Sequence, residues 1–188
     1  MVIDEFMPVF DVSKRYSIKV SAPVNNVYSA LKDVNIYDSP LIRVLFFLRR
    51  LPAIFKSQNK GSTGNKLTIS DISNSGFILL DEKCDDELVI GIVGKFWKLS
   101  GDIMPVSAKL FRSFNEKGFA KAAWNFSVRP MGQAVTELST ETRVQCTDES
   151  SRKKFIRYWK LIGPFSGVVR REMMKLIKRN AEKETCSK

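Results

Sequence analysis

The first regular pattern in the chain is an alternation of apolar and polar side chains. Tyr16, Ile18 and Val20 alternate with charged or hydroxyl-bearing residues, and this two-residue period is typical of a half-buried strand. The Ser-Ala-Pro run at 21–23 is typical of a helix start, because proline fits the first helical position. Apolar residues then recur every three to four positions. We therefore expect one strand, a short amphipathic helix, and a second short helix over 38–52.

Six further strands are predicted after the two helices, separated by turns rich in Gly, Asn, Asp and Ser. They cover residues 66–72, 77–83, 87–94, 96–99, 120–128 and 134–146. The last two alternate most clearly, with one apolar, threonine-rich face and one mostly charged face. This pattern predicts an antiparallel sheet with one covered and one solvated face, and an exposed Glu141–Arg143 pair on the solvated face. Residues 103–117 are less regular, with a helical turn expected over 108–111.

The C-terminal part of the chain predicts a long amphipathic helix. Asp148 can cap its N-terminus. Its apolar stripe consists of Phe155, Tyr158, Trp159, Ile162, Phe165, Val169, Met173 and Leu176. Gly163 and Pro164 interrupt this run, and proline lacks the backbone donor that a helix needs. We expect either a kinked helix or two helices end to end, with a frayed tail over 180–188.

This order of elements resembles the helix-grip fold of the START-like (SRPBCC) superfamily. That superfamily includes the birch-pollen allergen, polyketide cyclases/dehydrases and lipid-transfer domains. The most specific stretches are 21–24, 87–97, 136–144 and 151–162, which are similar to a bacterial branch whose members mostly lack an assigned activity. The resemblance covers nearly the whole chain as one domain, 1–188. It implies an α+β fold in which a curved seven-stranded antiparallel sheet, two short helices and a long kinked C-terminal helix enclose a cavity.

Composition narrows the chemistry. The 188 residues include no histidine, which excludes Ser-His-Asp triads, Cys-His nucleophiles and His-containing zinc sites. Cys84, Cys146 and Cys186 are too widely spaced for a metal cluster or a disulfide framework. The acidic run at 81–87 lacks the ligand spacing of a calcium loop and indicates a hairpin turn with solvated charges. We expect neither a cofactor nor a metal.

The net charge of +11 is concentrated at the C-terminal end of the chain. Residues 152–188 hold twelve Lys+Arg and three Asp+Glu, a net charge of +9. Residues 1–151 hold 19 Lys+Arg and 17 Asp+Glu, a net charge of +2. This basic helix face allows three interpretations: a solvated surface, a contact with an anionic membrane, or a nucleic-acid contact. The third is disfavoured because the aromatic residues fall on the opposite stripe. The residues concerned are Arg152, Lys153, Arg157, Lys160, Arg171, Lys175 and Lys178.

Inward-facing side chains are the candidates for a cavity wall. They are Trp97, Trp124, Phe126, Leu138, Thr140, Thr142, Tyr158 and Trp159. Each also suits a packed core, while the two threonine hydroxyls could orient a ligand. Without histidine, an enzyme would have to use Asp, Glu, Lys, Tyr or Cys with a shifted pKa as its acid or base. Tyr28, Tyr158 and Cys146 are expected nearest the sheet–helix interface, although packing alone accounts for each.

The resemblance implies that the cavity holds an apolar or amphipathic ligand, but it carries over no catalytic residue, since the superfamily shares none. We therefore expect binding of a hydrophobic small molecule or lipid without catalysis. The alternative is a cyclase/dehydrase-like or hydrolase-like enzyme using Tyr, Asp or Glu acid–base chemistry. The acidic N-terminus and the short apolar run at 44–48 indicate neither a signal peptide nor a membrane span. We expect a soluble, cytoplasmic protein.

Overall fold

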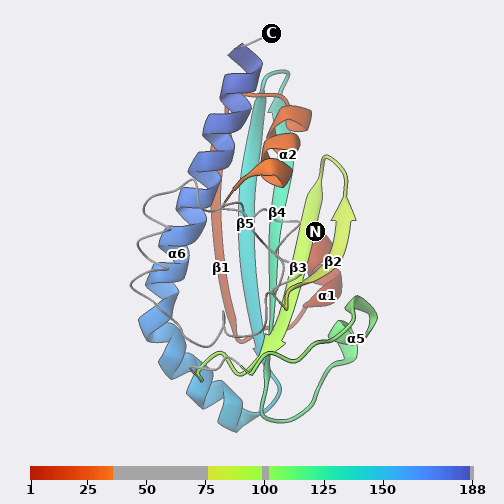
Figure 1. Ribbon diagram of the computed structural model, residues 1–188, viewed down its shortest axis with the longest axis vertical. Helices are drawn as coiled ribbons and strands as arrows, with labels where there is room; N and C mark the ends of the chain where they lie inside the picture. Colours follow the sequence, from red (N-terminus) through yellow and green to blue (C-terminus); the bar gives the residue numbers. More distant parts are fainter. Residues whose placement is uncertain (36–75, 99–101, 187–188) are drawn as a thin grey trace, which may run out of the picture.

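The computed structural model describes residues 1–35, 76–98 and 102–186 of the chain (Figure 1). In these ranges it is an α+β structure. Its elements are α1 (Val2–Phe6), β1 (Val12–Val20), α2 (Val24–Asp33), β2 (Ile78–Lys83), β3 (Glu87–Gly94), α5 (Ala108–Ser113), β4 (Ala120–Gly132), β5 (Val135–Cys146) and α6 (Glu149–Cys186). The described strands form one five-stranded sheet in the order β1-β5-β4-β3-β2, with every neighbouring pair antiparallel.

The register of the sheet collects the site candidates on one face. On β5, Thr142 lies opposite Trp124 of β4 and opposite Lys14 of β1. Two residues earlier on β5, Thr140 lies opposite Tyr16 of β1. Residues that are directly opposite on neighbouring strands, and residues two apart on one strand, share a face of the sheet. The first strand of the chain is therefore brought beside its last strand, with these side chains on the same face.

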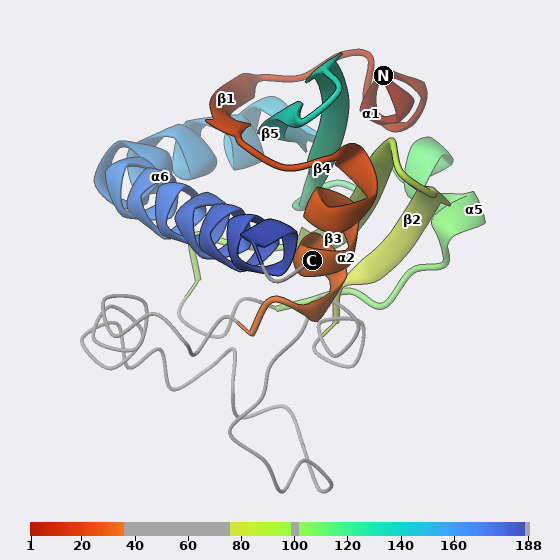
Figure 2. The same ribbon diagram turned by 90° about the horizontal axis from the view of Figure 1, so that it is seen from above.

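Helices cover both faces of the sheet. Figure 2 shows α6 and α2 on one side, which we call the inner face, and α1 and α5 on the other, the outer face. The inner layer is a buried apolar cluster that includes Val20, Leu31, Leu138, Met173 and Ile177. The outer layer is a second cluster that includes Ile3, Val89, Phe111, Phe119 and Ala123.

The C-terminal helix is one continuous element, with Pro164 inside it. Its axis changes direction in the N-terminal half (Figure 1), as a proline that removes a backbone donor is expected to cause. The kinked-helix alternative is thus confirmed. The helix continues to Cys186 and Ala181 is fully buried, whereas the sequence predicted a frayed tail from residue 180. Phe165 of the predicted apolar stripe is 49% exposed and is not part of the packed core.

The described sheet has five strands, not the seven predicted. Residues 96–98 form a turn, closed by a hydrogen bond from Lys98 N to Lys95 O (2.8 Å), and not the expected strand. The strand predicted over 66–72 and the helix predicted over 38–52 lie outside the described residues. The helical turn predicted over 108–111 is confirmed as the start of α5, which Ser107 caps.

The outer face is covered, whereas the sequence predicted a solvated one. The short helix α1 was not predicted; it packs on β3 and β4, while α5 packs on β2 and β3. As a result Glu141 and Arg143 are each only 7% exposed, and their expected surface pair is a buried one. Glu87, predicted to lie in a solvated turn, is also buried because it begins β3 beneath α1.

Candidate functional site

The predicted cavity residues fall into two apolar clusters and a band at the margin of the first. Phe126 and Leu138 are completely packed in the cluster formed with α2 and the C-terminal half of α6. Trp97, Tyr158 and Trp159 belong to a separate cluster around Phe155, at the N-terminal end of α6. We name a group of inner-face residues at the margin of the first cluster the central band; its two aromatic residues, Tyr16 and Trp124, pack against that cluster. The residues of the central band are Tyr16, Trp124, Thr140, Thr142 and Arg170.

The Thr140 hydroxyl is fully used inside the protein. The indole Nε1–H of Trp124 donates to Thr140 Oγ1 at 2.6 Å, and Thr140 Oγ1 donates to the backbone oxygen of Asn125 at 2.6 Å. These bonds fix the indole ring against β5. Thr140 therefore positions Trp124, and its hydroxyl has no donor left for a ligand.

The Thr142 hydroxyl is different. The residue is 5% exposed, and Oγ1 is a buried polar atom without a hydrogen-bond partner in the described residues. Leaving such a group unsatisfied is unfavourable by about 1–3 kcal/mol, and it calls for an explanation. Of the two threonines predicted to orient a ligand, Thr142 is the one that retains a free donor.

Arg170 of α6 completes the central band. Its side chain is 8% exposed, and the guanidinium carbon lies 5.4 Å from the ring centroid of Trp124. Burial lowers the pKa of Arg170 to about 10, and the nearby Tyr16 opposes this effect. At neutral pH the side chain is therefore a buried cation against an aromatic ring.

Arg170 is not among the site residues predicted from the sequence. It stands between Val169, which was assigned to the apolar stripe, and Arg171, which was assigned to the basic face. The signal was present in the helical spacing. Met174, Ile177 and Ala181 are buried at intervals of three and four residues, and continuing this line backwards reaches Arg170 and Gly167. A charged residue on a buried helical line was the feature to notice.

Tyr16 lies where α6 approaches β1 most closely. A Cβ atom added to Gly167 would overlap the Tyr16 hydroxyl oxygen, so glycine is what permits this contact. The guanidinium carbon of Arg171, also on α6, lies 5.5 Å from the Tyr16 ring centroid. The phenol of Tyr16 is thereby placed between β1 and α6, one helical turn before Arg170.

The titratable groups that the sequence singled out do not converge. Tyr28 packs in the inner cluster and donates to Glu82 Oε1 at 2.9 Å, and burial with this carboxylate raises its pKa. Cys146 is the last residue of β5, where burial and, as the smaller effect, the charge of Asp11 raise the pKa of its thiol to about 12. Tyr158 is half-buried near Cys146. Neither Tyr28 nor Cys146 is poised to lose a proton at neutral pH.

A buried polar network lies on the outer face. Glu87 accepts hydrogen bonds from the backbone N–H of Val2 (2.7 Å) and from the side-chain amide of Asn125 (2.5 Å). Arg143 donates through Nε to Glu141 Oε1 at 2.7 Å and through Nη1 to the backbone oxygen of Met7 at 3.0 Å. These groups satisfy one another, which is typical of a structural network.

Metal ligation gains no support in the part of the chain that the structure describes. None of its Cys, Asp and Glu side chains form a group of three that could hold an ion. Within the acidic run, Glu82 is taken by Tyr28 and by an ion pair with Lys32 (3.1 Å). No helix among the described residues is long and apolar enough to span a membrane.

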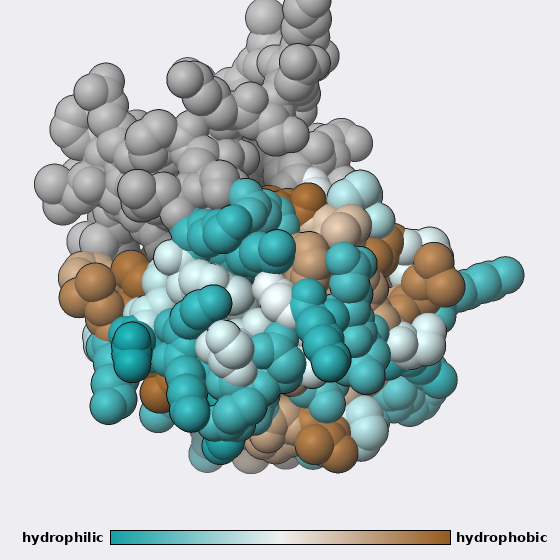
Figure 3. Space-filling view, turned by 90° about the horizontal axis from the view of Figure 1, so that it is seen from below, coloured by the Kyte–Doolittle hydropathy of each residue, from teal (hydrophilic) through white to brown (hydrophobic). Residues whose placement is uncertain are grey.

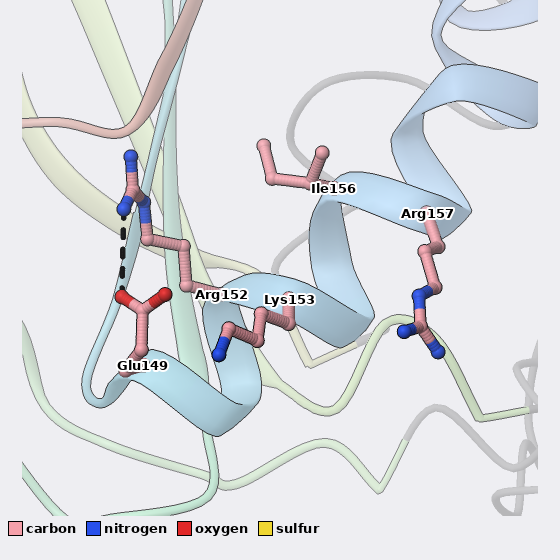
Figure 4. Close-up of a pocket in the computed structure, with 5 residues that line it drawn as sticks. All are labelled: Glu149, Arg152, Lys153, Ile156 and Arg157. Carbon is pink, nitrogen blue, oxygen red and sulfur yellow. Dashed lines mark hydrogen bonds and ion pairs between the residues drawn. The ribbon is translucent and has the colours of Figure 1, made fainter.

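The basic face of α6 carries a shallow hollow at its N-terminal end. Hydrophilic residues cover most of this end of the molecule (Figure 3). The hollow has a volume of about 340 Å³ and is lined by Glu149, Arg152, Lys153, Ile156 and Arg157 (Figure 4). Arg152 pairs with Glu149 (3.4 Å) and with Asp11 (2.9 Å). Part of the basic charge is thus neutralised by carboxylates of the chain itself.

Comparison with known proteins leaves the family open. No protein-family model matches the chain, and no curated protein matches it. A conserved protein from Geobacillus kaustophilus shares 13% identity at a TM-score of 0.45, over 92% of this chain and 96% of its own. The ZhuI aromatase/cyclase from Streptomyces sp. R1128 shares 12% sequence identity at a TM-score of 0.33, and the match covers 93% of this chain and 95% of its own. Norcoclaurine synthase from Thalictrum flavum shares 16% sequence identity at a TM-score of 0.37, and the match covers 93% of this chain and 97% of its own. Likenesses of this strength assign neither a family nor an activity.

Proposed function

We propose that this protein binds a hydrophobic or amphipathic small molecule, such as a lipid, between the inner face of the sheet and α6, without catalysing a reaction on it. The observation that carries the proposal is the central band. There the partly buried aromatic rings of Tyr16 and Trp124 pack at the margin of the inner cluster, and the buried cation Arg170 and the Thr142 hydroxyl lie beside them. Ligand sites are lined mainly by apolar and aromatic side chains with a few polar groups among them.

The packing of α6 supports this location. The helix buries Phe155 near one end and Met173, Met174 and Ile177 toward the other. Over residues 160–166, in contrast, it contributes no buried side chain. The middle of α6 therefore contributes less to the packed core than either end does. The central band lies next to this middle segment, because Gly167 contacts Tyr16.

Binding without catalysis is favoured over an enzyme by the placement of the acids and bases. Tyr28 and Cys146 lie in different clusters, and the pKa of each is raised. The buried carboxylates Glu87 and Glu141 are on the outer face, on the other side of the sheet from the central band. General acid–base catalysis needs a side chain that can exchange a proton within hydrogen-bond reach of the substrate, and these four groups do not lie in the central band.

Fluorescence of the neutral apolar probe 1-N-phenylnaphthylamine tests the proposal. We expect saturable binding of about one probe per chain. Ala122→Phe should weaken it at least ~10-fold, because Ala122 is two residues from Trp124 on the same face and the larger ring would fill the site. Leu110→Phe on α5 is the matched control, since Leu110 is 59% exposed on the other side of the sheet. Absence of saturable binding, or equal binding by the Ala122→Phe variant with its fold intact, would contradict the proposal.

A further inference from the structure

Arg170 is a buried cation for which the described residues supply no anion. Its side chain is 8% exposed, and its one described polar contact is with the ring of Trp124. A cation–π contact returns only part of what a guanidinium loses when it leaves water. Its pKa of about 10 keeps Arg170 charged at neutral pH, and the described residues leave this charge without a negative partner.

The hydroxyl groups of the central band add donors to the same place. Thr142 lies directly opposite Trp124, the residue that Arg170 covers, and its buried Oγ1 has no hydrogen-bond partner among the described residues. The Tyr16 hydroxyl reaches α6 at Gly167, three residues before Arg170. A guanidinium fork with neighbouring hydroxyls is the donor set that a carboxylate or a phosphate oxygen accepts from.

The surroundings of these donors differ in polarity. Ile18 and Val169 are partly buried apolar side chains that continue from the central band into the packed inner cluster. Lys14 shares the face of Thr142 on the neighbouring strand and is exposed, so it adds positive potential at the edge of the band. An anion would therefore be attracted from the open side, and an apolar chain would find matching surface beside it.

We infer that the ligand of this site is an amphipathic anion, whose oxyanion head binds the Arg170 guanidinium and accepts hydrogen bonds from the hydroxyls of Thr142 and Tyr16. This inference rests on the proposed function, since it names the class of ligand for the same site. The head is a carboxylate or a phosphate ester, and the apolar body lies along Trp124 toward the inner cluster.

A pair of probes that differ only in charge tests the inference. cis-Parinaric acid and its methyl ester have the same fluorescent chain, and only the acid carries the anion. We expect the wild-type protein to bind the acid at least ~10-fold more tightly than the ester, the size of effect that a charge-assisted hydrogen bond supplies. Equal affinity for the two would overturn the inference while leaving the proposed function intact. Failure of both probes to bind would overturn the proposed function itself.

Substitutions assign the preference to its residues. Arg170→Met keeps the side-chain length without the charge, so it should reduce acid binding to the level of the ester and leave the ester unchanged. Arg179→Met, at an exposed position on the same helix, should retain the wild-type preference. Thr142→Val keeps the shape of the side chain and should weaken binding of the acid several-fold, while binding of the ester should not change. It also decides the matter if Arg170→Met does not fold. An unchanged acid preference in either site variant would overturn the assignment.

Competition distinguishes the two possible heads. Myristate and 1-myristoyl-lysophosphatidic acid are each titrated against bound cis-parinaric acid, with myristyl alcohol as the neutral competitor. Stronger displacement by myristate supports a fatty-acid type of ligand, and stronger displacement by the phosphate ester supports a phospholipid type. Displacement by the alcohol as effective as by either anion would overturn the inference.

Discussion

The carboxylate of Glu87 accepts a 2.7 Å hydrogen bond from the backbone N–H of Val2, and so ties β3 to the first turn of α1. The N–H of Ile3 (3.3 Å) and the amide of Asn125 donate to the other oxygen. Because Glu87 is only 2% exposed, these donors have no ready replacement from solvent. The cover of the outer face depends on this contact.

We predict that Glu87→Ala lowers the free energy of unfolding by roughly 2–4 kcal/mol, because several buried donors lose their acceptor. Glu87→Gln retains one acceptor oxygen and should lose less. Urea denaturation monitored by circular dichroism measures both changes. Asp86→Ala, at an exposed neighbouring position, should stay within ~0.5 kcal/mol of the wild type. Equal stability of the Glu87→Ala and Asp86→Ala variants would contradict the structural role.

The buried pair of Glu141 and Arg143 predicts strong coupling. Arg143→Met should lower the free energy of unfolding by roughly 3–5 kcal/mol, since it leaves the Glu141 carboxylate buried without its cation. Adding Glu141→Gln removes that charge, so the double variant should be more stable than Arg143→Met alone. A double-mutant cycle in urea gives the coupling energy. Additive effects would show that the two side chains do not interact as a buried pair.

The cysteines are predicted to differ in reactivity. The thiolate is the nucleophilic form, and burial beside Asp11 raises the pKa of Cys146 to about 12. Cys84 is exposed, so iodoacetamide at pH 8 should modify Cys84 first and Cys146 only slowly. Mass spectrometry of a Cys186→Ser variant under native conditions follows the two sites separately. The difference should disappear in urea, and equal native rates would contradict the burial of Cys146.

The basic face of α6 is a candidate contact for anionic membranes. We expect weak co-sedimentation with vesicles containing phosphatidylserine, lost as salt is raised, because each basic residue near such a surface contributes about 1 kcal/mol. The triple variant Lys153→Gln, Arg157→Gln and Lys160→Gln removes three exposed charges from this face and should reduce binding strongly.

A charge-matched control separates this surface from net charge alone. Lys83→Gln, Lys109→Gln and Lys117→Gln also remove three exposed charges, but from other parts of the molecule. This control should bind nearly as well as the wild type. Equal loss in the two triple variants would point to net charge, and no binding by the wild type at low salt would contradict a membrane contact altogether.

How far the sequence predicts the site depends on how local each signal is. Alternation along β4 and β5 correctly placed Trp124, Thr140 and Thr142 on the inner face, because strand geometry alone decides the face. It did not distinguish the two threonines. That distinction arises from the indole of Trp124, which occupies the Thr140 hydroxyl and leaves that of Thr142 free.

The missed features depend on contacts that are distant in sequence. The helix α1 has five residues, too few for a periodic pattern, yet it converts the charged face of β5 into a buried one. Phe165 is half exposed although it continues the predicted apolar spacing, because the buried line of α6 passes through Gly167 and Arg170 and not through Phe165. Arg170 lies on the buried line of α6, which the helical spacing indicates, but its contact with the Trp124 ring joins residues 46 positions apart and cannot be derived from that spacing.

The close contact of Gly167 with Tyr16 predicts a reversal in the effect of one substitution. Alanine stabilises a helix by ~1 kcal/mol relative to glycine, but a Cβ at position 167 would overlap the Tyr16 hydroxyl oxygen. Gly167→Ala should therefore lower the free energy of unfolding in the wild-type background. In a Tyr16→Phe background the nearest remaining ring atom, Cζ, is 3.2 Å from the added carbon, which requires a shift of only a few tenths of an ångström.

The same Gly167→Ala change should consequently be neutral or stabilising, by up to ~1 kcal/mol, once the hydroxyl is absent. Urea denaturation of the four variants measures the reversal. Ser166→Ala, one position earlier on the helix, should have the same effect in both backgrounds. If Gly167→Ala destabilises both backgrounds equally, another part of the helix–sheet contact opposes the methyl group, and the Tyr16 hydroxyl does not lie against α6. Since that hydroxyl is one of the three donors assigned to the anionic head, the result also bears on where the head binds.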